Sequence, residues 1–142
     1  MVDISFASIS KKMKGFHWPS FDVVVGVARG GIVPASLIAH QHQCDLHIIQ
    51  VNYRDDSNQP QHDSPVLLSD TNPWETIPLH QKILLVDDVS VTGKTLDFAL
   101  QFFKNHQVIT FALKGKADHV LFTDVKSCVN WPWKINQPQK IN

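Results

Sequence analysis

Two adjacent carboxylates, Asp87 and Asp88, are the residues of this chain best suited to chemistry, together with the segment 91–95, Val-Thr-Gly-Lys-Thr, that follows them. Free N–H groups at the start of a helix, with the helix dipole behind them, bind a phosphate. Carboxylates accept hydrogen bonds from sugar hydroxyls and bind Mg²⁺. This stretch therefore predicts a phosphate site beside a site for a diol or a metal ion.

The elements around this stretch should bring those groups to the edge of a sheet. Four apolar residues, 83–86, precede the carboxylates and predict a buried strand that ends at Asp87. Apolar periodicity after the turn predicts a helix from about Gly93 to Asn105. Because ligands of open α/β sheets bind at the carboxyl ends of strands, this is where a ligand is expected.

A second loop, Ala28-Arg29-Gly30-Gly31, lies between a β-branched run at 23–27 and an expected helix from Ile32 to Cys44. Glycines let the backbone approach an anion closely, and arginine supplies a fixed fork of donors for phosphate. The sequence thus predicts two anion-binding loops, each directly after a buried strand.

Two other nucleotide or phosphate folds share part of the pattern. Gly93-Lys94-Thr95 looks like the end of a P-loop, but a P-loop needs another glycine five residues before its Gly-Lys pair, and Asp88 stands there. A phospho-acceptor receiver domain also has an acidic pair, but it does not explain the loop Thr-Gly-Lys-Thr. Neither class is expected.

Strand and helix patterns alternate along the chain, which predicts an α/β fold with a doubly wound, mostly parallel sheet. A length of 142 residues suits a single domain, 1–142. The other expected elements are a helix over 5–15, capped by Ser5 with Phe6, Ile9 and Met13 on one face, and strands over 46–51, 108–113 and 119–122.

The segment 53–81 is different, because it is polar and contains four prolines. A long excursion of this kind in a compact domain is usually a functional loop or a disordered one.

Composition excludes several functions. The chain is 43% hydrophobic, and its formal net charge is +0 with no long basic run, so binding of nucleic acid or a membrane through bulk charge is not expected. No apolar run approaches membrane-spanning length and the N-terminus lacks a signal-peptide core. Cys44 and Cys128 form no disulfide framework or metal pattern, so the cytoplasm is the expected location.

Residues 87–95 closely resemble the motif of type I phosphoribosyltransferases, in which two acidic residues precede a Thr-Gly-x-Thr loop. The resemblance implies that the loop binds the 5-phosphate of phosphoribosyl pyrophosphate, and that the acidic pair binds the ribose hydroxyls, partly through Mg²⁺ with Asp88 as its ligand. In that family the residues equivalent to Arg29-Gly30-Gly31 bind the pyrophosphate, so the resemblance implies the same role for them here. The implied donor-binding set is Arg29, Gly30, Gly31, Asp87, Asp88, Val89, Ser90, Val91, Thr92, Gly93, Lys94 and Thr95.

Two further stretches are similar to the xanthine-guanine and hypoxanthine branch of that family: residues 27–35 and Trp131-Pro132-Trp133. The resemblance implies a small C-terminal hood segment and a mobile loop at about 53–81. It also implies that the base stacks on Trp133 and that Lys114 donates to a purine 6-oxygen. The implied base-binding residues are Lys114, Trp133 and Lys134, whereas core packing explains Trp131 at least as well.

Two residues depart from the family pattern on the base side. Val91 stands where many 6-oxopurine enzymes have the aspartate that handles N7 of the base, so no catalytic residue is assigned. Lys134 follows Trp133, where an acidic residue is usual.

The resulting expectation is a Mg²⁺-dependent enzyme of purine salvage, a homodimer or tetramer, that transfers the phosphoribosyl group to a purine base, expected to be a 6-oxopurine. Two alternatives stay open. One is a regulatory protein that binds phosphoribosyl pyrophosphate or a nucleotide without turnover, and the other is an enzyme for adenine or a pyrimidine.

Overall fold

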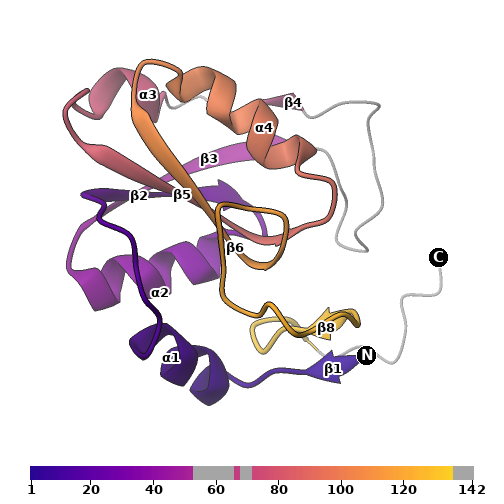
Figure 1. The fold of residues 1–142 in the computed structure, drawn as a ribbon. Helices are drawn as coiled ribbons and strands as arrows, with labels where there is room; N and C mark the ends of the chain where they lie inside the picture. The colour runs from indigo at the N-terminus through magenta and orange to yellow at the C-terminus, as the bar shows by residue number, and fades with distance from the viewer. Residues whose placement is uncertain (53–65, 68–71, 136–142) are drawn as a thin grey trace.

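A central sheet of six strands, in the order β4-β3-β2-β5-β6-β7, organises the computed structural model, which describes residues 1–52, 66–67 and 72–135 (Figure 1). Five strands are parallel to their neighbours, and β4 is antiparallel to β3. This arrangement confirms the expected mostly parallel α/β sheet. The strands are β2 (Val23–Ala28), β3 (Asp45–Asn52), β4 (Val66–Leu67), β5 (Lys82–Ser90), β6 (Gln107–Gly115) and β7 (His119–Val120).

Helices cover both faces of the sheet, as a doubly wound fold requires (Figure 1). On one face lie α1 (Phe6–Lys14) and α2 (Ile32–His42), and on the other lie α3 (Pro73–Thr76), α4 (Lys94–Leu100) and the 3₁₀ turn η1 (Gln101–Phe103). A hydrophobic core lies on each face of the sheet, and alternate residues of β5 pack into the two cores. Leu84 and Val86 face α2, and Ile83 and Leu85 face α4. A strand covered on both faces is a rigid base for the loop that leaves it.

The first helix forms as the sequence predicts. The Ser5 hydroxyl oxygen accepts a hydrogen bond from the Ser8 N–H at 3.0 Å, and Gly15 ends the helix. Ile9 and Met13 are fully buried, but Phe6 on the same face stays 49% exposed.

A small two-stranded sheet stands apart from the main one and forms the hood. It pairs β1 (Val2–Asp3) in parallel with β8 (Val129–Asn130), close to α1 (Figure 1). The expected hood segment at the C-terminus is therefore built from both ends of the described chain.

Several boundaries differ from the expectations. β5 continues four residues past Val86, because β6 runs beside it and pairs Val89 with Lys114 and Ser90 with Gly115. α4 is shorter than expected and tightens into the 3₁₀ turn, a common way for a helix to end. α2 ends at His42, since Gln43 adopts a left-handed conformation with φ 53°.

Most of the expected loop at 53–81 lies outside the described residues, which resume at 66–67 in β4 and at 72 before α3. Among the helices of the described part, none combines the length and the apolar character needed to cross a membrane.

Candidate functional site

The first predicted anion-binding loop lies against Asp88 near the carboxyl end of β5, the strand that leads into the second predicted loop. β2 and β5 are parallel neighbours, with Gly26 opposite Val86, so the loops that follow them emerge side by side. A Cβ added at Gly30 would overlap the carboxyl group of Asp88, both oxygens included. The absence of a side chain at Gly30 therefore lets the first loop rest directly on the acidic pair.

The neighbouring Gly31 is equally constrained. A Cβ there would overlap the carbonyl oxygens of Val86 and Val27, and its N–H donates to the Val27 carbonyl at 2.8 Å. The peptide bond between Ala28 and Arg29 is cis. Arg29, the residue after this cis bond, is exposed.

The two carboxylates have different surroundings. Asp87 is only 8% exposed, and burial raises its pKa well above the usual aspartate range, with the charge of Asp88 adding to the rise. Asp88 is half-buried, and its Oδ1 accepts a hydrogen bond from the Val89 N–H at 2.6 Å. Asp87 Oδ1 likewise accepts from the Asp88 N–H at 2.8 Å. The pair thus offers one carboxyl in a protein interior and one partly open to solvent.

The phosphate loop turns sharply at Gly93, whose φ of +86° is a conformation that glycine adopts without strain. The Thr92 Oγ1 accepts a hydrogen bond from the Lys94 N–H at 3.3 Å. Val91, Thr92 and Lys94 are exposed. The first turn of α4 therefore begins directly behind an exposed, hydroxyl-bearing loop.

Val89 and Ser90 belong to β5 and not to the loop. A Cβ at Gly115 would overlap the Ser90 carbonyl oxygen, and the Lys116 N–H donates to that oxygen at 2.8 Å. Ser90 itself is 5% exposed. These two predicted donor residues fix the strand that carries the loop, a role for which Gly115, missed from the sequence, is required.

Lys114 lies next to Val89 in the register of β5 and β6. Its ammonium donates to the backbone carbonyls of Ser127 at 2.5 Å and Lys126 at 3.4 Å. The predicted base-binding lysine thus stands at the same edge of the sheet as the donor loops. It also holds the segment that leads into the hood.

The predicted stacking residue Trp133 is half-buried and already has aromatic neighbours. Its ring lies parallel to that of Trp131, with centroids 5.3 Å apart and an interplanar angle of 1°, and 6.2 Å from the ring of Phe6. Trp131 is 2% exposed, which confirms that it is a core residue.

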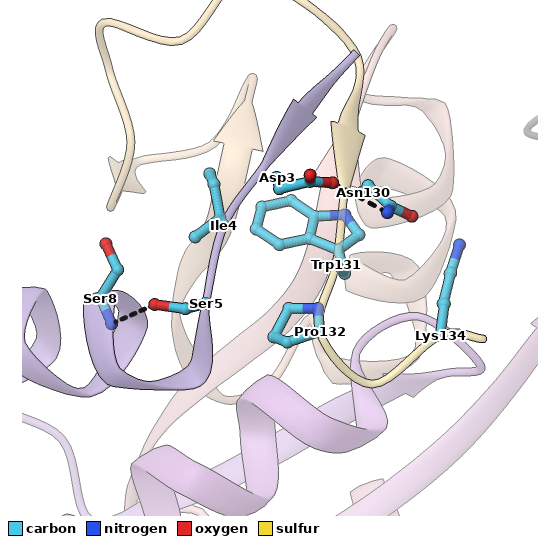
Figure 2. A pocket seen from close by; sticks show the side chains of 8 residues that line it. All are labelled: Asp3, Ile4, Ser5, Ser8, Asn130, Trp131, Pro132 and Lys134. Atoms are coloured by element: carbon cyan, nitrogen blue, oxygen red, sulfur yellow. Dashed lines mark hydrogen bonds between the residues drawn. The ribbon is translucent and has the colours of Figure 1, made fainter. Parts of the chain in front are cut away.

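Lys134 is exposed and lines a cavity of about 460 Å³ in the hood. Figure 2 shows this cavity between the start of α1 and the segment around Trp131, and none of its lining residues comes from the donor loops. The structure therefore groups Lys134 with the hood. The residues that line the cavity are Asp3, Ile4, Ser5, Ser8, Asn130, Trp131, Pro132 and Lys134.

The described residues contain no group of three or more histidine, cysteine or acidic side chains placed to hold a metal ion. Magnesium in proteins is commonly held by one or two carboxylates together with the phosphates of a substrate. The half-buried carboxylate of Asp88 fits a site of this kind, in which the substrate's phosphates supply the other ligands of the ion.

The two predicted donor loops were identifiable from the sequence, and their role remains a prediction. Three residues that contact one another or Trp133 in the hood were not singled out there as hood residues: Asp3, Phe6 and Asn130. The Asn130 side-chain amide donates to Asp3 Oδ1 at 2.9 Å, and Phe6 contacts Trp133. Nothing in local periodicity marks a contact between residues 127 positions apart. The sequence placed Phe6 on the apolar face of the first helix with Ile9 and Met13, so it gave no signal for the contact with Trp133.

Comparison with known families and structures gives a consistent picture. The family model described as phosphoribosyl transferase domain matches residues 4–139. No curated protein matches the chain.

Solved structures with the same fold cover most of the chain. The purine phosphoribosyltransferase of Pyrococcus horikoshii is 24% identical with a TM-score of 0.63, over 96% of this chain and 95% of that one. The xanthine-guanine-hypoxanthine phosphoribosyltransferase of Helicobacter pylori is 18% identical with a TM-score of 0.73, over 94% of each chain. A hypothetical protein of Neisseria gonorrhoeae with bound ppGpp is 18% identical with a TM-score of 0.72, over 94% of this chain and 90% of that one. Adenine phosphoribosyltransferases are similar as well.

Proposed function

The chain belongs to the phosphoribosyl transferase domain family, and from this premise we propose that it transfers the phosphoribosyl group of phosphoribosyl pyrophosphate to a 6-oxopurine and releases pyrophosphate. Family membership confirms the resemblance found in residues 87–95 and the enzyme class, a phosphoribosyltransferase. The acceptor and the roles of individual residues are the parts we propose.

The contact between Gly30 and Asp88 is the observation that supports the proposal most. It places a loop suited to pyrophosphate against carboxylates suited to the ribose hydroxyls. One ligand that carries a ribose between two phosphate groups can reach both loops at once. Phosphoribosyl pyrophosphate is such a ligand.

In this proposal each donor residue has a distinct task. The N–H groups and hydroxyls of 91–95 bind the 5-phosphate, and Arg29 with Gly30 and Gly31 binds the pyrophosphate. Asp87 and Asp88 bind the ribose diol, and Asp88 contributes a ligand to Mg²⁺. Bound Mg²⁺ would neutralise charge on the leaving pyrophosphate. Placement and electrostatics carry such a substitution through an oxocarbenium-like transition state, so the chain needs no nucleophile.

The difference between the carboxyl groups suits a diol. A sugar hydroxyl donates one hydrogen bond and can accept another, and a protonated carboxyl can supply the second. Because burial raises the pKa of Asp87, this residue is the one able to carry such a proton while Asp88 stays the metal ligand.

On the acceptor side, an ammonium donor such as Lys114 suits the oxygen of a 6-oxopurine better than the amino group of adenine. Trp133 offers a flat aromatic surface for stacking, which contributes about 1–3 kcal/mol per base in nucleic-acid complexes. Lys134 is assigned to the base side only through its place in the hood. Similar structures include adenine enzymes, so the choice of base rests on Lys114.

A binding protein without turnover is the second candidate, and Val91 favours it. Its side chain is 45% exposed in the loop and cannot transfer a proton to the base. The structural relative with bound ppGpp makes a guanine nucleotide a reasonable ligand for such a protein.

The wider assignments are proposals too. We propose one domain over 1–142, a homodimer or tetramer, and a cytoplasmic location in purine salvage. Light scattering of the purified protein and cell fractionation test the assembly and the location.

One assay tests the proposed function directly. Pyrophosphate release should be measured with Mg²⁺, phosphoribosyl pyrophosphate and each of hypoxanthine, guanine, xanthine, adenine and uracil. The proposal expects release with at least one 6-oxopurine. Donor binding without release for any base would instead support the binding protein, and release with adenine or uracil alone would reassign the acceptor.

A further inference from the structure

Within the hood, the N-terminal strand β1 holds the strand β8, which ends shortly before Trp133. β1 pairs with β8, with Val2 opposite Val129 and Asp3 opposite Asn130, and the Val2 N–H donates to the Cys128 carbonyl at 2.9 Å. Figure 2 shows the side-chain bond between Asn130 and Asp3, which measures 2.9 Å, beside Trp131 and Pro132. The backbone that leads to Trp133 is thus fixed by residues from the other end of the chain.

The ring of Trp133 is also oriented by residues outside its own segment. Trp131 lies parallel to it and is itself packed into the core, 6.2 Å from the ring of Phe122. Phe6 lies against Trp133 at an interplanar angle of 55°. Phe6 is the first residue of α1, whose start is fixed by the Ser5 cap. Two rings, one from each end of the chain, therefore define the plane of the Trp133 indole.

We propose that Phe6 and Asp3 are positioning residues for the acceptor base: they hold Trp133 in the plane on which a purine stacks. This inference rests on the proposed function. A flat surface that is already oriented loses less freedom when a base stacks on it, so its orientation contributes to affinity for the base and not for the sugar donor. Neither residue belongs to the donor loops.

Two ligands separate base binding from donor binding. Guanosine 5-monophosphate carries a purine, and phosphoribosyl pyrophosphate with Mg²⁺ carries none. Calorimetric titration of Phe6→Ala should give about 3- to 10-fold weaker binding of the nucleotide and unchanged binding of the donor. The separate variant Phe6→Tyr should keep the nucleotide affinity of the wild type, because it keeps the ring. Leu79→Ala, which removes a side chain that is 61% exposed, should change neither affinity.

A variant that keeps apolar volume guards against a simple loss of folding. Phe6→Leu keeps an apolar side chain at this half-exposed position but has no ring, so it should lose nucleotide affinity while its melting temperature stays close to that of the wild type. For Asp3, the single change to Ala should weaken nucleotide binding. The exchange Asp3→Asn with Asn130→Asp should restore it, because the amide and carboxylate only trade places.

The outcomes distinguish the two levels of the proposal. If the wild type binds both ligands and the Phe6 variants bind the nucleotide equally well, or lose both ligands alike, the positioning role is refuted while the proposed function stands. If the wild type binds neither ligand, the proposed function is refuted and the positioning role with it.

Discussion

Asp87 combines a position in the strand with burial that an aspartate seldom has. Its pKa is raised well above the ordinary value because the carboxyl is removed from water and because Asp88 is adjacent. An acid whose folded-state pKa exceeds its unfolded value binds more protons in the native state. Stability therefore falls as the pH rises from the unfolded pKa, about 3.9, through the higher folded one. Asp87 is thus a residue whose ionised form lowers stability.

We predict that Asp87→Asn raises the melting temperature at neutral pH and weakens donor binding. The amide oxygen can still accept from the Asp88 N–H, while the cost of an ionised buried group disappears. Calorimetric melting across pH should show a smaller fall in stability for the variant than for the wild type. Asp124→Asn removes the charge of an exposed carboxylate and is the matched control, with no comparable rise. A lower melting temperature for Asp87→Asn would contradict the assignment.

At position 91 the type of the residue, a valine without a titratable group, matters more than its packing. Val91 is exposed in the loop, and in the proposed function the phosphate is bound by backbone N–H groups and neighbouring hydroxyls, so an aspartate there should leave donor affinity unchanged. General acid–base assistance contributes roughly 10²–10⁴-fold. We predict slow turnover in the native protein and a higher rate with a 6-oxopurine in Val91→Asp, measured as pyrophosphate release.

The matched control for Val91 is an isosteric change. Val91→Thr keeps the shape of the side chain but adds no carboxylate, and it should leave the rate near that of the native protein. A Val91→Asp variant with normal donor binding and no gain would mean that the base proton is handled elsewhere, or that the acceptor is not a 6-oxopurine.

At the scale of elements, the candidate site depends on the close approach of the loop after β2 to Asp88 in β5, the parallel strand beside β2. Gly30 is the point of contact, and any side chain there meets the carboxyl group of Asp88. Since both loops are anchored in buried strands, neither can retreat without disturbing the pairing of β2 and β5.

We therefore predict that Gly30→Ala weakens donor binding by roughly tenfold or more and destabilises the fold by about 1–3 kcal/mol, as overpacking does. Titration calorimetry and denaturant unfolding measure the two effects. Gly15→Ala is the control, because its nearest neighbour would be the Lys11 carbonyl oxygen at 3.7 Å, in ordinary contact and away from the site. Normal donor affinity in Gly30→Ala would show that the loop need not rest on Asp88.

For the whole molecule, phosphoribosyl pyrophosphate is the ligand that the proposed enzyme requires, and it is one of two ligands proposed for the binding protein, the other being a guanine nucleotide. A ligand that binds only the native state stabilises it, by about 2.7 kcal/mol at a hundredfold excess over its dissociation constant. This effect does not depend on which base is accepted or on turnover.

We predict that phosphoribosyl pyrophosphate with Mg²⁺ raises the melting temperature in a concentration-dependent way, and that chelation of the metal reduces the shift. Asp88→Asn should lose most of the Mg²⁺-dependent part of the shift, while Asp124→Asn should keep it. Scanning calorimetry provides the measurement. A wild type whose melting temperature is unaffected at millimolar donor would argue against the enzyme and against a binding protein for this donor, and would leave a protein that binds a guanine nucleotide.

Much of this fold was determined by local sequence. β-branched and apolar runs predicted the buried strands β2, β3, β5 and β6, because a parallel strand covered on both faces needs a continuous apolar run. The two loops follow such strands directly, and parallel strands end at one edge of their sheet, so both loops were expected at that edge. That β2 and β5 are neighbours there was decided by the tertiary structure. The proposed 5-phosphate loop and the acidic pair are contiguous residues, so the sequence shows them as one pattern.

Tertiary structure decided what contiguous residues cannot determine. Asp87 and Asp88 are adjacent in sequence, yet only packing makes one carboxyl buried and the other half-open. The extension of β5 to Ser90 required β6 alongside it, with Gly115 admitting the Ser90 carbonyl. The hood joins Asp3 to Asn130 across 127 positions. Such contacts depend on how distant segments meet, and helix or strand periodicity carries no information about that.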